Sequence, residues 1–283
     1  MTIQEALAET TSLLSDSESP QLDARLLLQK ATGLSAVSLI TRRNRQLSPS
    51  EETGIKALRA RRMSHEPMAY ILGHREFYDL DFLVDKRVLI PQPDTETLID
   101  AVLGSTKPDA GLRILDVCTG SGCIGITLAR HLHCQVVLAD LSSDALDVAE
   151  ANAGRLLVPG QYTLAQGDLL EAVEGMFDLI VSNPPYLTKA DIEEVTDEVR
   201  HEPYMALDGM GDDGLDLIRA LVPQTRTHLK AGGRLLLECD PSQCPTVKSL
   251  LLANGFCSVY IVKDLASRDR VVGGATEHVR AAD

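Results

Sequence analysis

The chain has 283 residues, of which 44% are apolar and 24% are charged, and its formal net charge is −14. The apolar fraction excludes an intrinsically disordered chain, and the length predicts one large domain or a large domain with a small one. No apolar run approaches the ~20 residues of a membrane-spanning helix, and the N-terminus lacks the basic flank and apolar stretch of a signal peptide. We therefore expect a cytoplasmic protein with no membrane partner.

The acidic charge is concentrated in the second part of the chain. Residues 1–85 contain 10 Lys/Arg and 12 Asp/Glu, so residues 86–283 carry −12 of the total. Phosphate contacts need clustered Lys and Arg, so we expect no direct nucleic-acid binding. One basic stretch near the N-terminus is either a solvated helix face or a docking patch for an acidic partner or RNA. It comprises Arg42, Arg43, Arg45, Lys56, Arg59, Arg61 and Arg62.

The cysteines and histidines do not suggest a metal centre. No two cysteines form a C-x-x-C pair, and most lie within apolar runs, so we expect them to be reduced and buried. The cysteines are Cys118, Cys123, Cys134, Cys239, Cys244 and Cys257. The closely spaced His131 and His133 fit a helix end better than a ligand set, and we expect no metal site.

Residues 1–66 are predicted to form a small helical domain. Ser19 and Pro20 supply an N-cap and a first-turn proline, and Gly33 ends the helix that follows. Ser48 repeats this arrangement, with Glu51 three residues later completing a capping box. Short helices of this kind bury their apolar faces by forming a bundle.

Residues 67–90 are predicted to form a β-hairpin connector. Leu80, Phe82 and Val84 alternate with acidic residues, as expected for a half-buried strand. The preceding MAYILG segment (68–73) is the expected partner strand. After the connector, Asp94 is placed to cap a helix.

Residues 91–283 are predicted to form an α/β domain. Six apolar runs read as strands, and segments with helical periodicity alternate with them. The runs are 113–118, 135–140, 162–166, 177–183, 233–239 and 257–262. Continuous apolar strands indicate a mostly parallel sheet that is covered by helices on both faces. Such sheets bind ligands at the carboxyl ends of their strands, so the functional residues are expected there.

A glycine-rich loop follows the first of these strands. Gly120, Gly122 and Gly125 satisfy G-x-G-x-x-G, which fits a nicotinamide enzyme as well as an S-adenosylmethionine (AdoMet) enzyme. Asp140, at the end of the second strand, would hold ribose hydroxyls in either case. The preceding Asp116 and Cys118 give the loop a form that resembles the methyltransferase version.

Asp168 follows the third strand. It either meets the adenine end of the cofactor or simply forms a turn.

The segment Asn183-Pro184-Pro185-Tyr186 follows the fourth strand and resembles the signature of methyltransferases that modify a planar nitrogen. An amide nitrogen is a poor nucleophile, because its lone pair is delocalised into the carbonyl. Two acceptors that hold both N–H groups would let the lone pair point at the methyl group. The Asn183 side-chain carbonyl and the Pro184 backbone carbonyl can supply them on a turn made rigid by two prolines, and the Tyr186 ring can stack on the substrate.

With these motifs, the chain resembles the protein-(glutamine-N5) methyltransferases of the PrmC/HemK family. The resemblance covers nearly the whole chain. It includes the segments 66–82, 88–100, 116–125, 139–153, 182–186, 201–219, 229–238 and 263–274.

The resemblance implies a class I AdoMet-dependent methyltransferase domain, Rossmann-like, with a seven-stranded sheet, and an N-terminal domain that docks the protein substrate. The substrate would be the glutamine of the Gly-Gly-Gln motif of class I peptide chain release factors. No metal is implied. The expected substrate and catalytic residues are Asn183, Pro184, Pro185 and Tyr186. The expected cofactor-binding residues are Asp116, Cys118, Thr119, Gly120, Ser121, Gly122, Asp140, Leu141, Asp168 and Asn183.

Two residues depart from the family pattern. Gln92 stands where the family often has Arg, which removes a cation near the cofactor. Cys118 replaces a frequent glycine, which requires that its backbone avoid positive φ.

Other functions remain open on the sequence alone. Glutamine methylation of a large-subunit ribosomal protein shares the same motifs. Adenine-N6 methylation of a nucleic acid is opposed by the −12 charge of residues 86–283. A non-catalytic AdoMet-binding adaptor and a nicotinamide dehydrogenase both leave the Asn-Pro-Pro-Tyr turn without a use.

Overall fold

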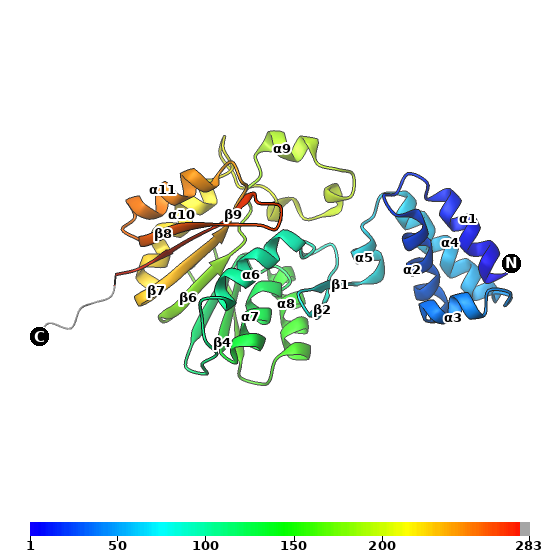
Figure 1. Ribbon diagram of the computed structural model, residues 1–283, viewed down its shortest axis with the longest axis horizontal. Helices are drawn as coiled ribbons and strands as arrows, with labels where there is room; N and C mark the ends of the chain where they lie inside the picture. Colours follow the sequence, from blue (N-terminus) through cyan, green and yellow to red (C-terminus); the bar gives the residue numbers. More distant parts are fainter. Residues whose placement is uncertain (278–283) are drawn as a thin grey trace, which may run out of the picture. The chain divides into compact units, whose positions relative to one another are not determined.

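The computed structural model describes residues 1–277, so residues 278–283 of the expected catalytic domain lie outside the described residues (Figure 1). The chain forms two compact units. The first comprises Met1–His74 and Thr196–His201, and the second comprises Arg75–Val195 and the chain from Glu202 onward. Within residues 1–277, no helix has the length and apolarity needed to cross a membrane.

The first unit is a bundle of helices. These are α1 (Ile3–Leu13), α2 (Pro20–Thr32), α3 (Ala36–Thr41), α4 (Pro49–Met63) and α5 (Met68–Leu72). The expected ends of α2 and α4 are confirmed, because Gly33 caps α2 with φ 68° and Ser48 forms a capping box with Glu51. Ser19 begins α2 without the expected side-chain cap bond. The side chains of Ile3, Leu28, Leu39 and Ile55 form much of the core.

The MAYILG segment is helical, so the prediction that it is a strand is wrong. It forms α5, in which Ala69, Tyr70 and Ile71 are buried, and Gly73 ends the helix with φ 82°. The hairpin lies later in the chain, between β1 (His74–Phe77) and β2 (Leu80–Leu83). A left-handed glycine stops a helix without strain, so Gly73 sets where the extended chain begins.

A buried ion-pair network holds the segment Thr196–His201, which includes the 3₁₀ turn η2 (Val199–His201), within the first unit. Arg62 is 8% exposed, and its Nε lies 2.7 Å from the Asp23 carboxylate. One terminal guanidinium nitrogen of Arg62 lies 2.6 Å from Glu198. The His201 ring also donates to the Ser64 carbonyl at 2.9 Å. This segment is therefore anchored to α4 and its C-cap, and only through Arg62 to α2, although it is distant from both in sequence.

The basic stretch of the first unit is largely engaged in ion pairs. Arg45 pairs with Glu51, Arg59 with Glu9, and Arg61 with Glu66, in addition to the Arg62 network. These internal partners favour a structural role for most of the stretch over a docking patch.

The second unit is built on a seven-stranded sheet of order β5-β4-β3-β6-β7-β9-β8. The strands are β3 (Arg113–Val117), β4 (Gln135–Asp140), β5 (Tyr162–Gln166), β6 (Phe177–Ser182), β7 (Leu229–Glu238), β8 (Cys257–Lys263) and β9 (Asp269–Ala275). The first five are parallel, and β9 is antiparallel to both β7 and β8. The six predicted strands are confirmed. The seventh strand, β9, was missed as a run because its charged start and paired glycines obscure the apolar pattern.

Helices cover both faces of the sheet because alternate strand residues point to opposite sides. Ile114 and Leu179 pack in the core that contains α6 (Glu96–Leu103), α7 (Cys123–Leu132) and α8 (Ser143–Leu156) (Figure 1). Leu115 and Ile180 pack in the opposite core, with α10 (Asp216–His228) and α11 (Cys244–Ala253). The connection from β6 to α10 carries α9 (Lys189–Glu194) and the 3₁₀ turn η3 (Tyr204–Ala206).

The register brings four strand ends together. Val117 of β3 pairs with Ala139 of β4 on one side and with Ser182 of β6 on the other. Ser182 in turn pairs with Leu237 of β7. The residues that follow these strands therefore emerge side by side at the carboxyl edge of the sheet.

Candidate active site

A cavity that is open to solvent lies at this carboxyl edge. Its wall combines the loops after β3, β4, β5 and β6 with the segment around η3. From the expected site, the wall includes Cys118, Gly120, Asp140, Leu141, Asp168, Asn183 and Pro185. It also includes Arg87, Pro203, Met205 and Ala206, which the sequence analysis did not single out. A concave, mostly apolar wall with a few polar groups is typical of a small-molecule site.

The glycine loop leaves space on the cavity side. Gly120 has φ 54°, and a Cβ built on it would meet no atom within 4 Å, although its backbone lines the cavity. Its N–H donates to Asp140 Oδ2 at 2.9 Å. The loop backbone is thus exposed to a ligand and tied to the acid at the end of β4.

Other expected loop residues support the loop from behind. Four of the expected loop residues do not line the cavity; they are Asp116, Thr119, Ser121 and Gly122. Asp116 is fully buried and accepts from the Thr119 hydroxyl at 2.6 Å and from the Gly125 N–H at 2.9 Å. Burial raises the pKa of Asp116 to about 7, against the effect of these two hydrogen bonds. The role of these residues in cofactor binding stays a prediction.

The expectation for the backbone of Cys118 is wrong. Its φ is 57°, in the left-handed region that favours glycine. The sharp turn out of β3 imposes this conformation, because the next residue, Thr119, donates its N–H to the Ala139 carbonyl at 3.0 Å. Burial raises the pKa of the Cys118 thiol to about 12, so this thiol is not an activated nucleophile.

Asp140 presents a carboxylate to the cavity from a fixed position. Backbone N–H groups of Gly120 and Ser142 each donate to one of its oxygens at 2.9 Å. Burial raises the pKa of Asp140, and these hydrogen bonds oppose that shift. Each carboxylate oxygen can accept a second hydrogen bond, so the residue suits a ligand diol such as a ribose. Asp168 lies exposed on another part of the wall.

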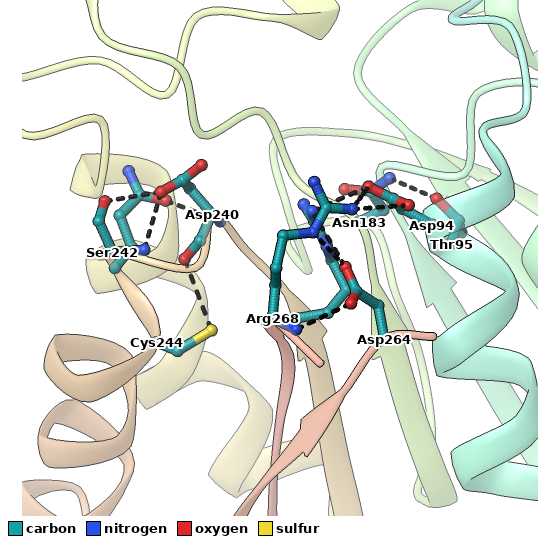
Figure 2. A network of polar contacts seen from close by, with 10 residues as sticks. Asp94, Thr95, Asn183, Asp240, Ser242, Cys244, Asp264 and Arg268 are labelled. Atoms are coloured by element: carbon teal, nitrogen blue, oxygen red, sulfur yellow. Dashed lines mark hydrogen bonds and ion pairs between the residues drawn. The ribbon is translucent and has the colours of Figure 1, made fainter. Parts of the chain in front are cut away.

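The Asn183-Pro184-Pro185-Tyr186 turn presents two acceptors. Asn183 Nδ2 donates to the Thr95 hydroxyl at 3.2 Å, as Figure 2 shows. The other amide atom, Oδ1, therefore faces away from Thr95. Within residues 1–277, neither Asn183 Oδ1 nor the Pro184 carbonyl accepts a hydrogen bond from the protein. Burial raises the pKa of the Tyr186 phenol, so it is neutral at ordinary pH.

Close backbone packing holds this turn in place. Gly214 has φ 69°, and a Cβ on it would lie 2.2 Å from the Tyr186 carbonyl oxygen. Gln243 Nε2 donates to the same Tyr186 oxygen and to the Asp213 carbonyl, both at 2.8 Å. The carbonyl of Tyr186 is therefore engaged with the protein, in contrast to the carbonyls of Asn183 and Pro184.

The sequence analysis missed polar residues behind the turn. The expectation that Asp94 caps a helix is wrong, because the N-caps of η1 and α6 are Gln92 and Thr95. Asp94 instead pairs with Arg270 at 2.8 Å. It also pairs with Arg268 at 3.1 Å, as Figure 2 shows. Thr95 and Glu238 are 2% and 1% exposed, and Glu238 ends β7, which pairs with β6, the strand that Asn183 follows. An acid at the carboxyl end of an apolar strand was the available signal for Glu238. Gln92, the other departure, donates its side-chain amide to the Ile90 carbonyl.

The sheet order, the glycine loop and the acid that ends β4 define a class I methyltransferase fold. A methyltransferase from Pyrococcus furiosus shares the fold, with a TM-score of 0.55 and 18% identity over 78% of this chain and 99% of that one. The PrmC N-terminal domain profile matches residues 5–73, and the methyltransferase small domain profile matches residues 95–212.

Two curated relatives are similar over almost the full length. The release factor glutamine methyltransferase of Geobacter sulfurreducens is 41% identical over 96% of both chains. The protein of the same name from Koribacter versatilis is 40% identical over 97% of this chain and 98% of its own. The chain belongs to the release factor glutamine methyltransferase family.

Proposed function

We propose that this protein transfers a methyl group from AdoMet to the side-chain amide nitrogen, N5, of the glutamine in the Gly-Gly-Gln motif of class I peptide chain release factors. The family relationship supports the substrate. The observation that carries the chemistry is the pair of free acceptors, Asn183 Oδ1 and the Pro184 carbonyl, on one rigid turn at the edge of the cavity.

The two acceptors suit a primary amide. Such a group has two N–H donors, and each acceptor would take one of them. Holding both donors fixes the amide plane and orients the nitrogen, which is the positioning that a weak nucleophile needs. As the new N–C bond forms and the bond from the methyl group to the AdoMet sulfur breaks, the nitrogen releases one proton to solvent water. Pro184 and Pro185 lack N–H groups, so they do not compete for the acceptors.

Residues of the cavity wall support the use of AdoMet. Bound AdoMet supplies the methyl group from its sulfonium, and S-adenosylhomocysteine is the leaving group. Asp140 would accept from the ribose hydroxyls, and the open space beside Gly120 would admit the ligand close to the backbone. Asn183 and Pro185 line the same cavity, so the turn would border the cofactor as well as the substrate.

The first unit would dock the release factor. It corresponds to the PrmC N-terminal domain match at residues 5–73. In this proposal residues 1–66 form the docking domain, residues 67–90 connect it, and residues 91–283 carry the catalytic site. The reaction would take place in the cytoplasm, where release factors act on ribosomes.

Labelled AdoMet tests the assignment. The protein is incubated with a purified release factor, with the release factor whose Gly-Gly-Gln glutamine is replaced by alanine, and with ribosomal subunits. Mass spectrometry then locates the modified peptide. We expect label on the release factor and none on its alanine variant. Label confined to a ribosomal protein or to RNA would contradict the proposed substrate.

A further inference from the structure

The Asn183 side chain can act as an acceptor in only one of its two orientations. Rotation by 180° about the last side-chain bond exchanges Oδ1 with Nδ2 and would present a donor to the substrate N–H groups. Packing alone discriminates poorly between two groups of nearly equal size. The protein therefore needs a hydrogen-bond partner that accepts from Nδ2 and cannot donate to Oδ1.

Thr95 occupies the position of that partner. It ends the 3₁₀ turn η1 (Pro93–Thr95), is 2% exposed, and accepts from Asn183 Nδ2 at 3.2 Å (Figure 2). A hydroxyl can also donate, so Thr95 by itself could serve either orientation of the amide. Its own proton must be directed elsewhere for the choice to be firm.

Glu238 is the group placed to take that proton. Its side chain is 1% exposed and neighbours the Thr95 side chain, which lowers the pKa of Glu238, and an ionised carboxylate is an acceptor without a donor. Its Oε2 is buried with no hydrogen-bond partner within residues 1–277, so this oxygen is available to accept the Thr95 proton. The positive charge of Arg270, which is 7% exposed at the side chain, favours the ionised form, while burial raises the pKa of Glu238 to about 7.

We propose that Thr95, with Glu238 behind it, is a positioning residue that fixes the orientation of the Asn183 amide and keeps Oδ1 available to the substrate glutamine. The relay runs from the Glu238 carboxylate through the Thr95 hydroxyl to Asn183 Nδ2. It rests on the proposed function, because the need for an acceptor comes from the substrate amide.

Thr95→Val tests the relay, because valine has the shape of threonine without its hydroxyl. At about pH 8, with saturating AdoMet, we expect kcat to fall on the order of tenfold, the effect of losing one hydrogen bond in the transition state. The Kd for AdoMet, measured by calorimetry, should change by less than about twofold, because Thr95 is not in the cavity wall. Thr95→Ser restores the hydroxyl and should keep kcat within about threefold of wild type.

A second background separates positioning from general damage. In Asn183→Ala, Thr95→Val should have no further effect on kcat, because the residue through which Thr95 acts is gone. An equal loss in both backgrounds, or an unchanged kcat in the single variant, would overturn the proposal. If Thr95→Val does not fold, Thr95→Val/Glu238→Leu removes the stranded carboxylate as well, and the same loss of kcat is expected.

A structure of Thr95→Val gives a readout that is independent of the substrate. We expect the Asn183 amide to rotate or to occupy two orientations. A single unchanged orientation would contradict the relay even if the substrate proves to be a different amide. If the wild-type protein fails to methylate the release factor, the proposed function is wrong, and the structure of the variant still decides the role of Thr95.

Discussion

Cys118 is a strained residue in the cofactor loop. Its φ of 57° places it where a side chain costs roughly 1–2 kcal/mol relative to glycine. The residue lines the cavity, and strain of this kind persists where the surrounding structure determines the backbone. The loop thus retains its shape with a residue that does not favour it.

Substitutions at Cys118 should reveal this strain. We expect Cys118→Gly to be more stable than Cys118→Ala by about 1 kcal/mol, because alanine keeps the Cβ that the left-handed backbone disfavours. Urea unfolding of the two variants measures the difference. If Cys118→Ala is as stable as Cys118→Gly or more stable, the loop relaxes to another conformation.

At the level of single residues, the sequence predicted seven residues of the cavity wall and missed the support behind it. Asp140 ends one apolar strand and Asn183 directly follows another, so the pattern alone places them at the sheet edge. Thr95 and Glu238 lie 143 positions apart in sequence, at the ends of η1 and β7. A single sequence contains no local signal for such a contact.

Among the elements, the ends of helices were predicted well where a cap specifies them. Ser48 and Glu51 form the expected box before α4. The short α5 was mistaken for a strand because five apolar-rich residues do not distinguish the two periods. Elements of this size are decided by packing, which the local sequence does not contain.

The element α4 also carries a buried charge whose removal should be costly. Arg62→Met would leave Asp23 buried without its cation, and we expect a loss of about 3–5 kcal/mol of unfolding free energy. Arg61→Met is the matched control, since Arg61 is 42% exposed at the side chain and pairs with Glu66, and it should lose less than about 1 kcal/mol. Urea titration followed by circular dichroism compares them. Equal losses would refute the role of the buried pair.

Across the whole molecule, buried carboxyl groups link stability to pH. Burial raises the pKa values of Asp116, Glu202 and Glu238 to about 7. The unfolded chain releases these protons near pH 4, so the folded protein binds more protons between about pH 4.5 and 7. Stability contributed by these groups is therefore present below this window and is lost as pH rises through it.

Glu202→Gln isolates one of these groups. Glu202 accepts from the Ile90 N–H at 3.0 Å, and the glutamine oxygen can keep that bond without a charge. We expect the variant to gain about 2–3 kcal/mol over wild type at about pH 8 and less than about 1 kcal/mol at about pH 5. Glu171→Gln, at an exposed position, is the control and should change little at either pH. A gain that does not depend on pH would contradict the linkage.

The whole-chain organisation was predicted in outline from the change of sequence period. The chain leaves the second unit after Val195, contributes Thr196–His201 to the first, and returns at Glu202. This exchange was not predicted, because it rests on the pairing of Arg62 with Glu198 across 136 positions. The α/β alternation is local, whereas a segment that crosses between units is specified by long-range contacts.

The central claim is that Asn183 holds the substrate amide, and its most direct test is the single-turnover rate of Asn183→Ala on a release factor with saturating AdoMet. We predict a fall of about 10²-fold or more, with AdoMet affinity largely retained, by analogy with the loss of one preorganised transition-state hydrogen bond. Asp140→Ala should show the opposite pattern, with weakened AdoMet binding and a rate that recovers as AdoMet is raised. A wild-type rate in Asn183→Ala would contradict the account.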